Sequence, residues 1–264
     1  MGPPVTGAFD LSGRVALVTG AGSPTGIGFA TGQLLAEMGA SVLVTSTTER
    51  IDDRVRELRA HGVDASGVVG DLTDPSTAPL LVAHALEKWG RLDVVVQNAG
   101  MYSISDPRVA NGSIEEMELT LWRAGLSRNL DSTFLVARAC LPAMAANAWG
   151  RLVFVSSVTG PVMAMSGEPA YAAAKAGMVG LARALALDWA ARGVTVNAVA
   201  PGWIETGVQT PFEFEQGLHT PVGRSARPEE VAATIGWLAS PGASYVTGQC
   251  VVVDGGNSIA EERG

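Results

Sequence analysis

The sequence predicts a single α/β domain built on a parallel sheet with helices on both faces. Short runs of apolar, β-branched residues alternate with longer segments of helical periodicity through most of the 264 residues. The runs are apolar at nearly every position, which is typical of strands buried on both faces. A glycine-rich turn joins the first run to the first helix, and no shift in composition marks a boundary within residues 1–264.

Seven strands are expected, of which the third is the weakest. They cover residues 14–19, 41–45, 65–69, 93–97, 151–156, 195–199 and 249–253.

Helices are expected over residues 26–38, 52–61, 75–89, 169–192 and 228–239. Gly39 closes the first of them, and Pro75 suits the first turn of the third. Residues 114–147 form either one long helix or two broken ones. Residues 203–224 show little regular pattern, and we expect them to form a loop that serves as a substrate lid. Residues 1–10 and 260–264 are expected to be loose tails.

Composition excludes several classes of protein. Hydrophobic residues make up 47% of the chain and charged residues 17%, which favours a compact globule over disorder. The net charge of −8 argues against nucleic acid or an anionic membrane surface as a partner. The two cysteines and three histidines show no metal-ligand spacing, so no metal is expected. Without a membrane-spanning apolar run or a signal peptide at residues 1–10, we expect a soluble cytoplasmic protein.

Tyr171 and Lys175 are spaced so that a helix would carry both on one face. At ~4 Å and an effective dielectric of ~20, an ammonium attracts a phenolate by ~4 kcal/mol, which could lower a tyrosine pKa from ~10 to near ~7. A group that titrates there suits general acid/base catalysis. The alternative is that the two side chains merely cover a surface of the helix.

Polar or small residues follow most of the predicted strands, where an open parallel sheet forms its ligand crevice. They are Gly20, Ser46, Asp71, Asn98, Ser157 and Pro201. The stretch from Gly20 to Gly28 lies between a strand and a helix, where glycines let the backbone approach a pyrophosphate. Read alone, it could be an ordinary turn.

Two further features indicate a function only in combination with these motifs. Asn98, Ala99 and Gly100 leave room for an adenosine ribose, or form a simple turn. Asn129 stands inside a predicted helix, where asparagine is a poor helix former. Its amide could bind water beside Lys175, or it could only mark a kink.

Taken together, these motifs resemble those of the short-chain dehydrogenase/reductase family over residues 11–258. The resemblance rests on the glycine loop, Asn98-Ala-Gly100, Asn129, Ser157, Tyr171-x-x-x-Lys175, Pro201-Gly202-x-x-x-Thr206 and Val253-Asp254-Gly255-Gly256. It implies a doubly wound Rossmann fold with a seven-stranded parallel sheet and a bound nicotinamide dinucleotide. Two features depart from the family pattern. Gly20 and Gly26 enclose five residues instead of three, and the segment 101–113 is longer than usual.

The resemblance also implies roles. Tyr171 would be the general acid/base, Lys175 would lower its pKa and bind the nicotinamide ribose, Ser157 would hold the substrate oxygen, and Asn129 a relay water. Thr206 would contact the carboxamide or the pyrophosphate. The expected dinucleotide contacts are Gly20, Gly22, Ser23, Thr25, Gly26, Ile27, Gly28, Ser46, Thr47, Asp71, Leu72, Asn98, Ala99, Gly100, Tyr171, Lys175, Pro201, Gly202, Ile204 and Thr206.

An oxidoreductase that moves a hydride between nicotinamide and a ketone or secondary alcohol is therefore expected. Reduction of a 3-oxoacyl thioester is the alternative, and a catalytically silent dinucleotide sensor a remote one. A carrier protein is acidic and would need a basic patch, which a chain of net charge −8 does not suggest, so a free small molecule is favoured. Family resemblance further suggests a homotetramer. Met163, Met165, Trp203 and Phe212 could form an apolar substrate pocket, or belong to the core.

The second strand end bears on the choice of cofactor. Thr45, Ser46, Thr47 and Thr48 offer hydroxyls and no carboxylate, and Arg50 follows. An acidic residue about there grips the ribose 2′-hydroxyl of NAD, whereas an arginine accommodates the 2′-phosphate of NADP. Glu49 could still bend toward the ribose. NADP(H) is therefore favoured, with NAD(H) as the alternative.

Overall fold

A computed structural model describes residues 5–100 and 111–261 and shows a seven-stranded sheet. Its order is β3-β2-β1-β4-β5-β6-β7, and every neighbouring pair is parallel, as the sequence predicts. The chain leaves β1 in one direction for β2 and β3 and in the other for β4, so the crevice of an open α/β sheet falls at β1 and β4. The strands are β1 Val15–Val18, β2 Ser41–Ser46, β3 Ala65–Val69, β4 Val94–Gln97, β5 Gly150–Val155, β6 Val194–Pro201 and β7 Cys250–Val253.

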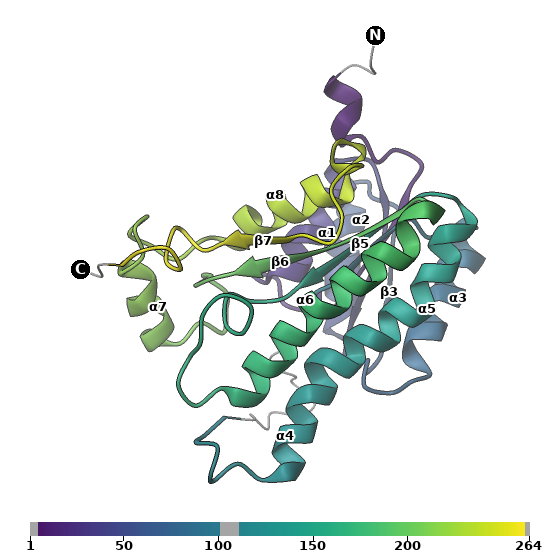
Figure 1. The fold of residues 1–264 in the computed structure, drawn as a ribbon. Helices are drawn as coiled ribbons and strands as arrows, with labels where there is room; N and C mark the ends of the chain where they lie inside the picture. The colour runs from purple at the N-terminus through teal and green to yellow at the C-terminus, as the bar shows by residue number, and fades with distance from the viewer. Residues whose placement is uncertain (1–4, 101–110, 262–264) are drawn as a thin grey trace.

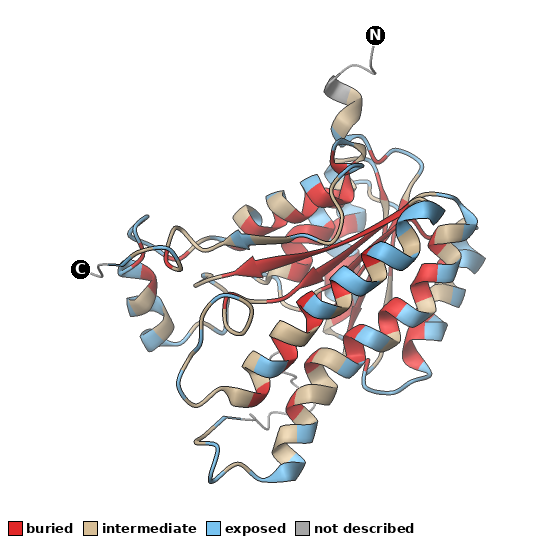
Figure 2. Ribbon diagram, in the orientation of Figure 1, coloured by how far each residue is buried: buried red, intermediate tan, exposed pale blue. Residues whose placement is uncertain are grey.

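Helices cover both faces of the sheet (Figure 1). One face packs against α1 Ile27–Glu37, α2 Arg50–Ala60 and α8 Pro228–Ala239. The other packs against α3 Thr77–Trp89, α5 Ser132–Ala146 and α6 Pro169–Trp189. Alternate residues of each strand fill the two cores: Ala16 and Val18 point to the first, Leu17 to the second. The strands are accordingly buried, while the helices are exposed on their outer faces (Figure 2).

The segment 114–147 is a broken helix, one of the two forms the sequence allows. Its parts are α4 Leu119–Leu126, a π-helical turn at Ser127–Asp131, and α5. The π turn contains Asn129, and such turns are frequent at functional sites.

Two sequence expectations are wrong in part. The predicted lid contains a helix, α7 Pro211–Leu218, instead of loop throughout. Thr210 and Glu213 form a capping box at its start, and proline occupies its first turn, so the start signal was present in the sequence. Within the predicted N-terminal tail, Val5–Phe9 form a 3-10 helix, and Leu11 after it is fully buried. Most of the long segment 101–113 lies outside the described residues.

Candidate active site

Tyr171 and Lys175 lie on α6 as the sequence predicts, with the Lys175 Nζ 5.5 Å from the centre of the Tyr171 ring. Lys175 is only 3% exposed, and its Nζ donates a hydrogen bond to the carbonyl of Val155, the last residue of β5, at 2.9 Å. Burial lowers the pKa of Lys175 to about 8. The side chain therefore keeps a positive charge at neutral pH beside the phenol.

The π turn explains how Asn129 joins this group. In an α-helix the backbone N–H at position 129 would bond to the Gly125 carbonyl, and the wider turn breaks that pattern. The Asn129 side-chain amide donates to that carbonyl instead, at 3.0 Å. A Cβ added to Gly100 would lie 2.6 Å from Asn129 Oδ1 and 3.5 Å from Lys175 Nζ. The amide oxygen, the ammonium and the Gly100 backbone thus converge on one point, where a glycine is required.

The two serines at the end of β5 have different partners. Ser156 is buried and donates from Oγ to the Lys175 carbonyl at 2.9 Å, so it ties the strand to α6. Ser157 is partly exposed, and its Oγ accepts a hydrogen bond from the Thr159 N–H at 3.1 Å. Ser157 follows the carboxyl end of β5 and Tyr171 belongs to the first turn of α6, so both lie at the same end of the sheet.

Glycines in the turn after β1 allow a ligand to approach the backbone closely. Gly20 has a positive φ of +66°, and a Cβ there would lie 2.8 Å from the Ala99 Cα. A Cβ on Gly28 would lie 2.6 Å from both Asn98 Nδ2 and the Gly20 carbonyl oxygen. Helix α1 begins after Gly26 with no side-chain cap, so its first N–H groups are available to a pyrophosphate.

A cavity of about 300 Å³ opens beside this turn at the carboxyl ends of β1 to β4. Eight of the predicted dinucleotide contacts line it: Gly20, Ser46, Thr47, Asp71, Leu72, Asn98, Ala99 and Gly100. The lining also includes Thr45 and Arg50, which the sequence suggested as partners of a 2′-phosphate, and six residues that it did not suggest, namely Gly70, Thr73, Ala124, Ser127, Arg128 and Ser132. Gly70 and Thr73 directly flank predicted contacts. The four from α4 to α5 depend on where the helix breaks, which the sequence left open.

The remaining predicted contacts lie outside that lining. They are Gly22, Ser23, Thr25, Gly26, Ile27 and Gly28 of the glycine turn, Tyr171 and Lys175 of α6, and Pro201, Gly202, Ile204 and Thr206. Pro201 ends β6, and the Gly202 N–H donates to the Val253 carbonyl at 2.9 Å. Thr206 follows within the same segment, which leads from the sheet into the predicted lid.

Arg50 is the unusual charged group of the cavity. Its Nε is buried and has no hydrogen-bond partner among the described residues. A Cβ on Gly22 would collide with that Nε, so the guanidinium lies directly against the glycine turn. Burial, and then the charge of Arg54, lower the pKa of Arg50. Ser46 is the last residue of β2 instead of the first after it, and its Oγ donates to the Thr48 carbonyl at 2.7 Å.

The four predicted pocket residues are not core residues. Met163, Met165 and Trp203 are partly exposed, and Phe212 on α7 is 58% exposed. The Trp203 and Phe212 rings pack edge to face with centres 6.3 Å apart. Met163 Sδ accepts a hydrogen bond from Asn257 Nδ2 at 3.7 Å. No group of residues in the described ranges could hold a metal ion, and no helix there is long and apolar enough to cross a membrane.

Comparison with known proteins gives the class of this fold and site. A family model described as enoyl-(acyl carrier protein) reductase matches residues 20–258. Cis-4-hydroxycyclohexanecarboxylate dehydrogenase of Sinomonas cyclohexanicum is 41% identical over 247 residues, which are 92% of this chain and 96% of that protein. The 3-oxoacyl-[acyl-carrier-protein] reductase FabG of Pseudomonas aeruginosa is 38% identical over 252 residues, 94% of this chain and 98% of that one.

A solved structure shares the fold at similar identity. It is from Beutenbergia cavernae, is described as an NAD(P)-dependent gluconate 5-dehydrogenase, and holds NADP at low occupancy. Its TM-score is 0.87 at 38% identity, and the match covers 96% of this chain and 100% of that one. The chain belongs to the short-chain dehydrogenase/reductase family. It is an oxidoreductase of the class that acts on alcohols and ketones with a nicotinamide dinucleotide.

Proposed function

We propose that this enzyme interconverts a free, small ketone and its secondary alcohol with NADP(H), using Tyr171 as the general acid/base. The convergence of Asn129 Oδ1 and Lys175 Nζ at Gly100, beside the Tyr171 ring, carries the proposal. That arrangement gives the phenol a neighbouring cation and a polar path for its proton. The chemistry fits a family whose relatives include dehydrogenases of hydroxylated small molecules.

A bound nicotinamide dinucleotide supplies or accepts the hydride. Tyr171 gives its phenolic proton to the carbonyl oxygen during reduction, while Ser157 donates a hydrogen bond to the same oxygen. Lys175 stabilises the phenolate that remains, because its ammonium is held at 5.5 Å from the ring by the Val155 carbonyl. Asn129 Oδ1 holds a water next to Lys175, through which the proton is replaced from solvent.

Arg50 supports NADP(H) over NAD(H). The Nε of Arg50 is buried without a hydrogen-bond partner among the described residues, which is costly unless a ligand accepts from it. It lines the cavity next to Ser46 and Thr47, and Asp71 is the one acidic residue among those lining residues. A ribose 2′-phosphate at the end of β2 would meet a positive charge and hydroxyls there.

The alternative is reduction of a 3-oxoacyl thioester on acyl carrier protein, as the names of several relatives indicate for those proteins. The net charge of −8 argues against it here, because an acidic carrier would be repelled. Glu168 immediately precedes α6, and its pKa is raised by burial and then by the charge of Glu213 on α7, with no basic group among the described residues to lower it. A silent sensor is disfavoured because Tyr171, Lys175 and Ser157 are all present.

A panel of ketones and secondary alcohols, assayed with both dinucleotides as free molecules and as acyl-carrier thioesters, tests the proposal. We expect turnover of free ketones with NADPH. Turnover confined to carrier thioesters would establish the alternative. Dinucleotide binding without turnover of any carbonyl would make the protein a sensor.

A homotetramer and a cytoplasmic location remain predictions. Exposed apolar side chains on two helices, Phe134 on α5 and Leu187 on α6, support assembly through these helices. Light scattering at micromolar concentration should give a tetramer's mass, and a monomer's mass would refute the assembly.

A further inference from the structure

The enlarged glycine turn makes a contact far along the chain. Thr25, within its extra residues, accepts a hydrogen bond at Oγ1 from the Gly207 N–H at 3.0 Å, across 182 residues of sequence. Gly207 follows Thr206 in the lid segment, residues 203–224. A Cβ on Gly207 would lie 2.6 Å from Thr25 Oγ1, and the other atom within reach is the Thr25 Cβ at 3.9 Å. Thr25 therefore occupies the space directly over Gly207.

The lid segment is bonded to itself, to Ser225 and Ala226 directly after it, and through the Val222 N–H to the Gly255 carbonyl at 3.2 Å. The Ala226 N–H donates to the Trp203 carbonyl at 2.9 Å, and the Glu205 N–H donates to the Ala226 carbonyl at 2.8 Å. Gln209 Nε2 donates to Ser225 Oγ at 2.8 Å, so the start of the segment is joined to its end. Such a unit can move as one piece, and the Thr25 bond joins it to the dinucleotide turn.

We infer that Thr25 is a positioning residue that couples lid closure to dinucleotide binding, an inference that rests on the proposed function. Thr25 immediately precedes Gly26, the residue before the start of α1, where a pyrophosphate would bind. A ligand that fixes this turn also fixes the Thr25 hydroxyl, which accepts the hydrogen bond from the Gly207 N–H. By thermodynamic reciprocity, a docked lid tightens dinucleotide binding by the same factor.

The first test measures dinucleotide affinity by titration and hydrogen exchange of the lid segment with and without NADPH. Thr25→Val removes the acceptor and keeps the side chain's shape, whereas Thr25→Ser keeps the hydroxyl. We expect Thr25→Val to raise the dissociation constant by about two- to tenfold, the size of one neutral hydrogen bond, and to abolish the protection of the lid by NADPH. Thr25→Ser should restore both. Thr120→Val, an exposed threonine on α4, is the matched control and should change neither.

A second variant separates coupling from direct contact between Thr25 and the dinucleotide. Gly207→Ala should push the Thr25 hydroxyl aside and weaken binding as Thr25→Val does. In a Thr25→Ala background the added methyl finds space, so Gly207→Ala should have no further effect. Additive effects of the two changes, or a silent Gly207→Ala, would overturn the coupling.

The same measurements tell failure of the coupling from failure of the proposed function. If NADPH protects the wild-type lid and protects it equally in Thr25→Val, the coupling is wrong and the proposed function stands. If neither NADPH nor NADH binds the wild type, the proposed function falls, and the coupling falls with it.

Discussion

Arg50 and Arg151 lie at opposite ends of the sheet and each has a buried Nε, but these two nitrogens differ in their hydrogen bonds. Arg151, near the amino end of β5, is 3% exposed, and its pKa is lowered to about 10 by burial and then by the charge of Arg14. Its Nε donates to the Ser240 carbonyl at 3.2 Å, another guanidinium nitrogen donates to the Gly150 carbonyl at 2.8 Å, and the group lies 4.3 Å from the Trp149 ring centre. Arg50, at the carboxyl end, has no partner for its buried Nε among the described residues.

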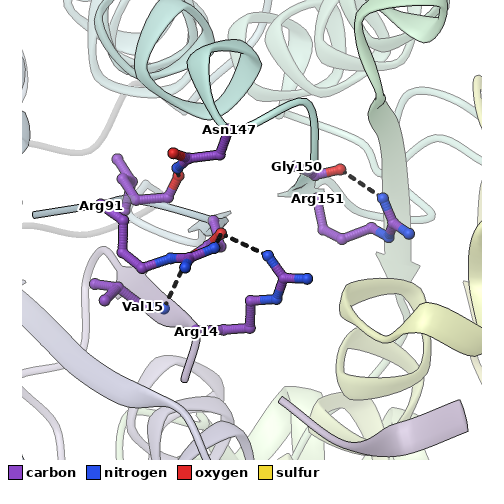
Figure 3. Close-up of polar contacts among 8 residues, drawn as sticks. Arg14, Val15, Arg91, Asn147, Gly150 and Arg151 are labelled. Atoms are coloured by element: carbon purple, nitrogen blue, oxygen red, sulfur yellow. Dashed lines mark hydrogen bonds and ion pairs between the residues drawn. The ribbon is translucent and has the colours of Figure 1, made fainter. Parts of the chain in front are cut away.

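The charged groups near Arg151 also find hydrogen-bond partners within the protein (Figure 3). Asp93 is fully buried, and its carboxylate accepts hydrogen bonds from the Val15 N–H at 3.0 Å, from Arg14 at 3.1 Å and from Arg91 at 2.7 Å. Each of these contacts lies within the chain. The charged groups at the amino end of the sheet are thus hydrogen-bonded within the protein, whereas at the carboxyl end the Arg50 Nε has no partner among the described residues. Changes at the two ends should therefore separate activity from stability.

Tyr171→Phe should give the largest effect on activity and almost none on stability. The ring stays while the proton donor goes, so kcat should fall by about 10²–10⁴, the usual contribution of general acid/base catalysis. Dinucleotide affinity should stay unchanged. Steady-state kinetics and a dinucleotide titration check both, and retention of more than about a tenth of the wild-type rate would remove Tyr171 from this role.

Arg151→Met should show the reverse pattern at the amino end. It removes the hydrogen bonds from Arg151 to the Ser240 and Gly150 carbonyls and loses the Trp149 contact, which should cost about 2–4 kcal/mol in the free energy of unfolding. The kcat/KM of the folded protein should not change. Urea unfolding measures the loss, with Arg192→Met as a control, because Arg192 stacks on Trp189 in a 3-10 turn without buried residues. Equal losses in both variants would contradict the distinction.

Lys175 affects both activity and stability. Burial lowers its pKa from 10.5 in the unfolded chain to about 8. Between these values the unfolded state binds more protons, so the Lys175 contribution to stability rises as pH rises. Below about pH 8 the buried ammonium keeps its full cost. The difference in unfolding free energy between wild type and Lys175→Met should therefore grow in favour of the wild type, by up to about 1.4 kcal/mol per pH unit above pH 8. A pH-independent difference would show that Lys175 is not desolvated.

Ser46→Asp should have the smallest effect, a change of preference between dinucleotides. The new carboxylate would repel a 2′-phosphate at a partly solvated site, by about 1–3 kcal/mol. The ratio of kcat/KM for NADPH to that for NADH should fall, with Thr120→Val as a control, because Thr120 is exposed and does not line the cavity. An unchanged ratio would place the 2′ position away from the end of β2.

The sequence predicts the parts of this molecule that depend on local pattern. The apolar runs marked every strand, and the Tyr171 to Lys175 spacing correctly put both residues on one helix, because a strand or helix period is a local property. The glycine turn likewise lies between β1 and α1 as predicted. The sequence did not predict the π turn at Asn129, because the helix propensity of one residue cannot distinguish a kink from a wider turn. The sequence placed Arg50 near the end of the second strand as a partner for a 2′-phosphate. It could not show that the Arg50 Nε lacks a partner among the described residues while the Arg151 Nε has one, because these contacts depend on residues distant in the chain.

The central claim is that the unmatched Arg50 guanidinium completes its hydrogen bonds on NADP(H). The most direct test is kcat/KM with NADPH and with NADH, for the wild type and for Arg50→Met. The wild type should prefer NADPH, and Arg50→Met should lower kcat/KM for NADPH by about tenfold or more, leave NADH nearly unchanged and not lower the unfolding free energy. A wild-type preference for NADH, or an equal loss with both dinucleotides, would contradict the claim.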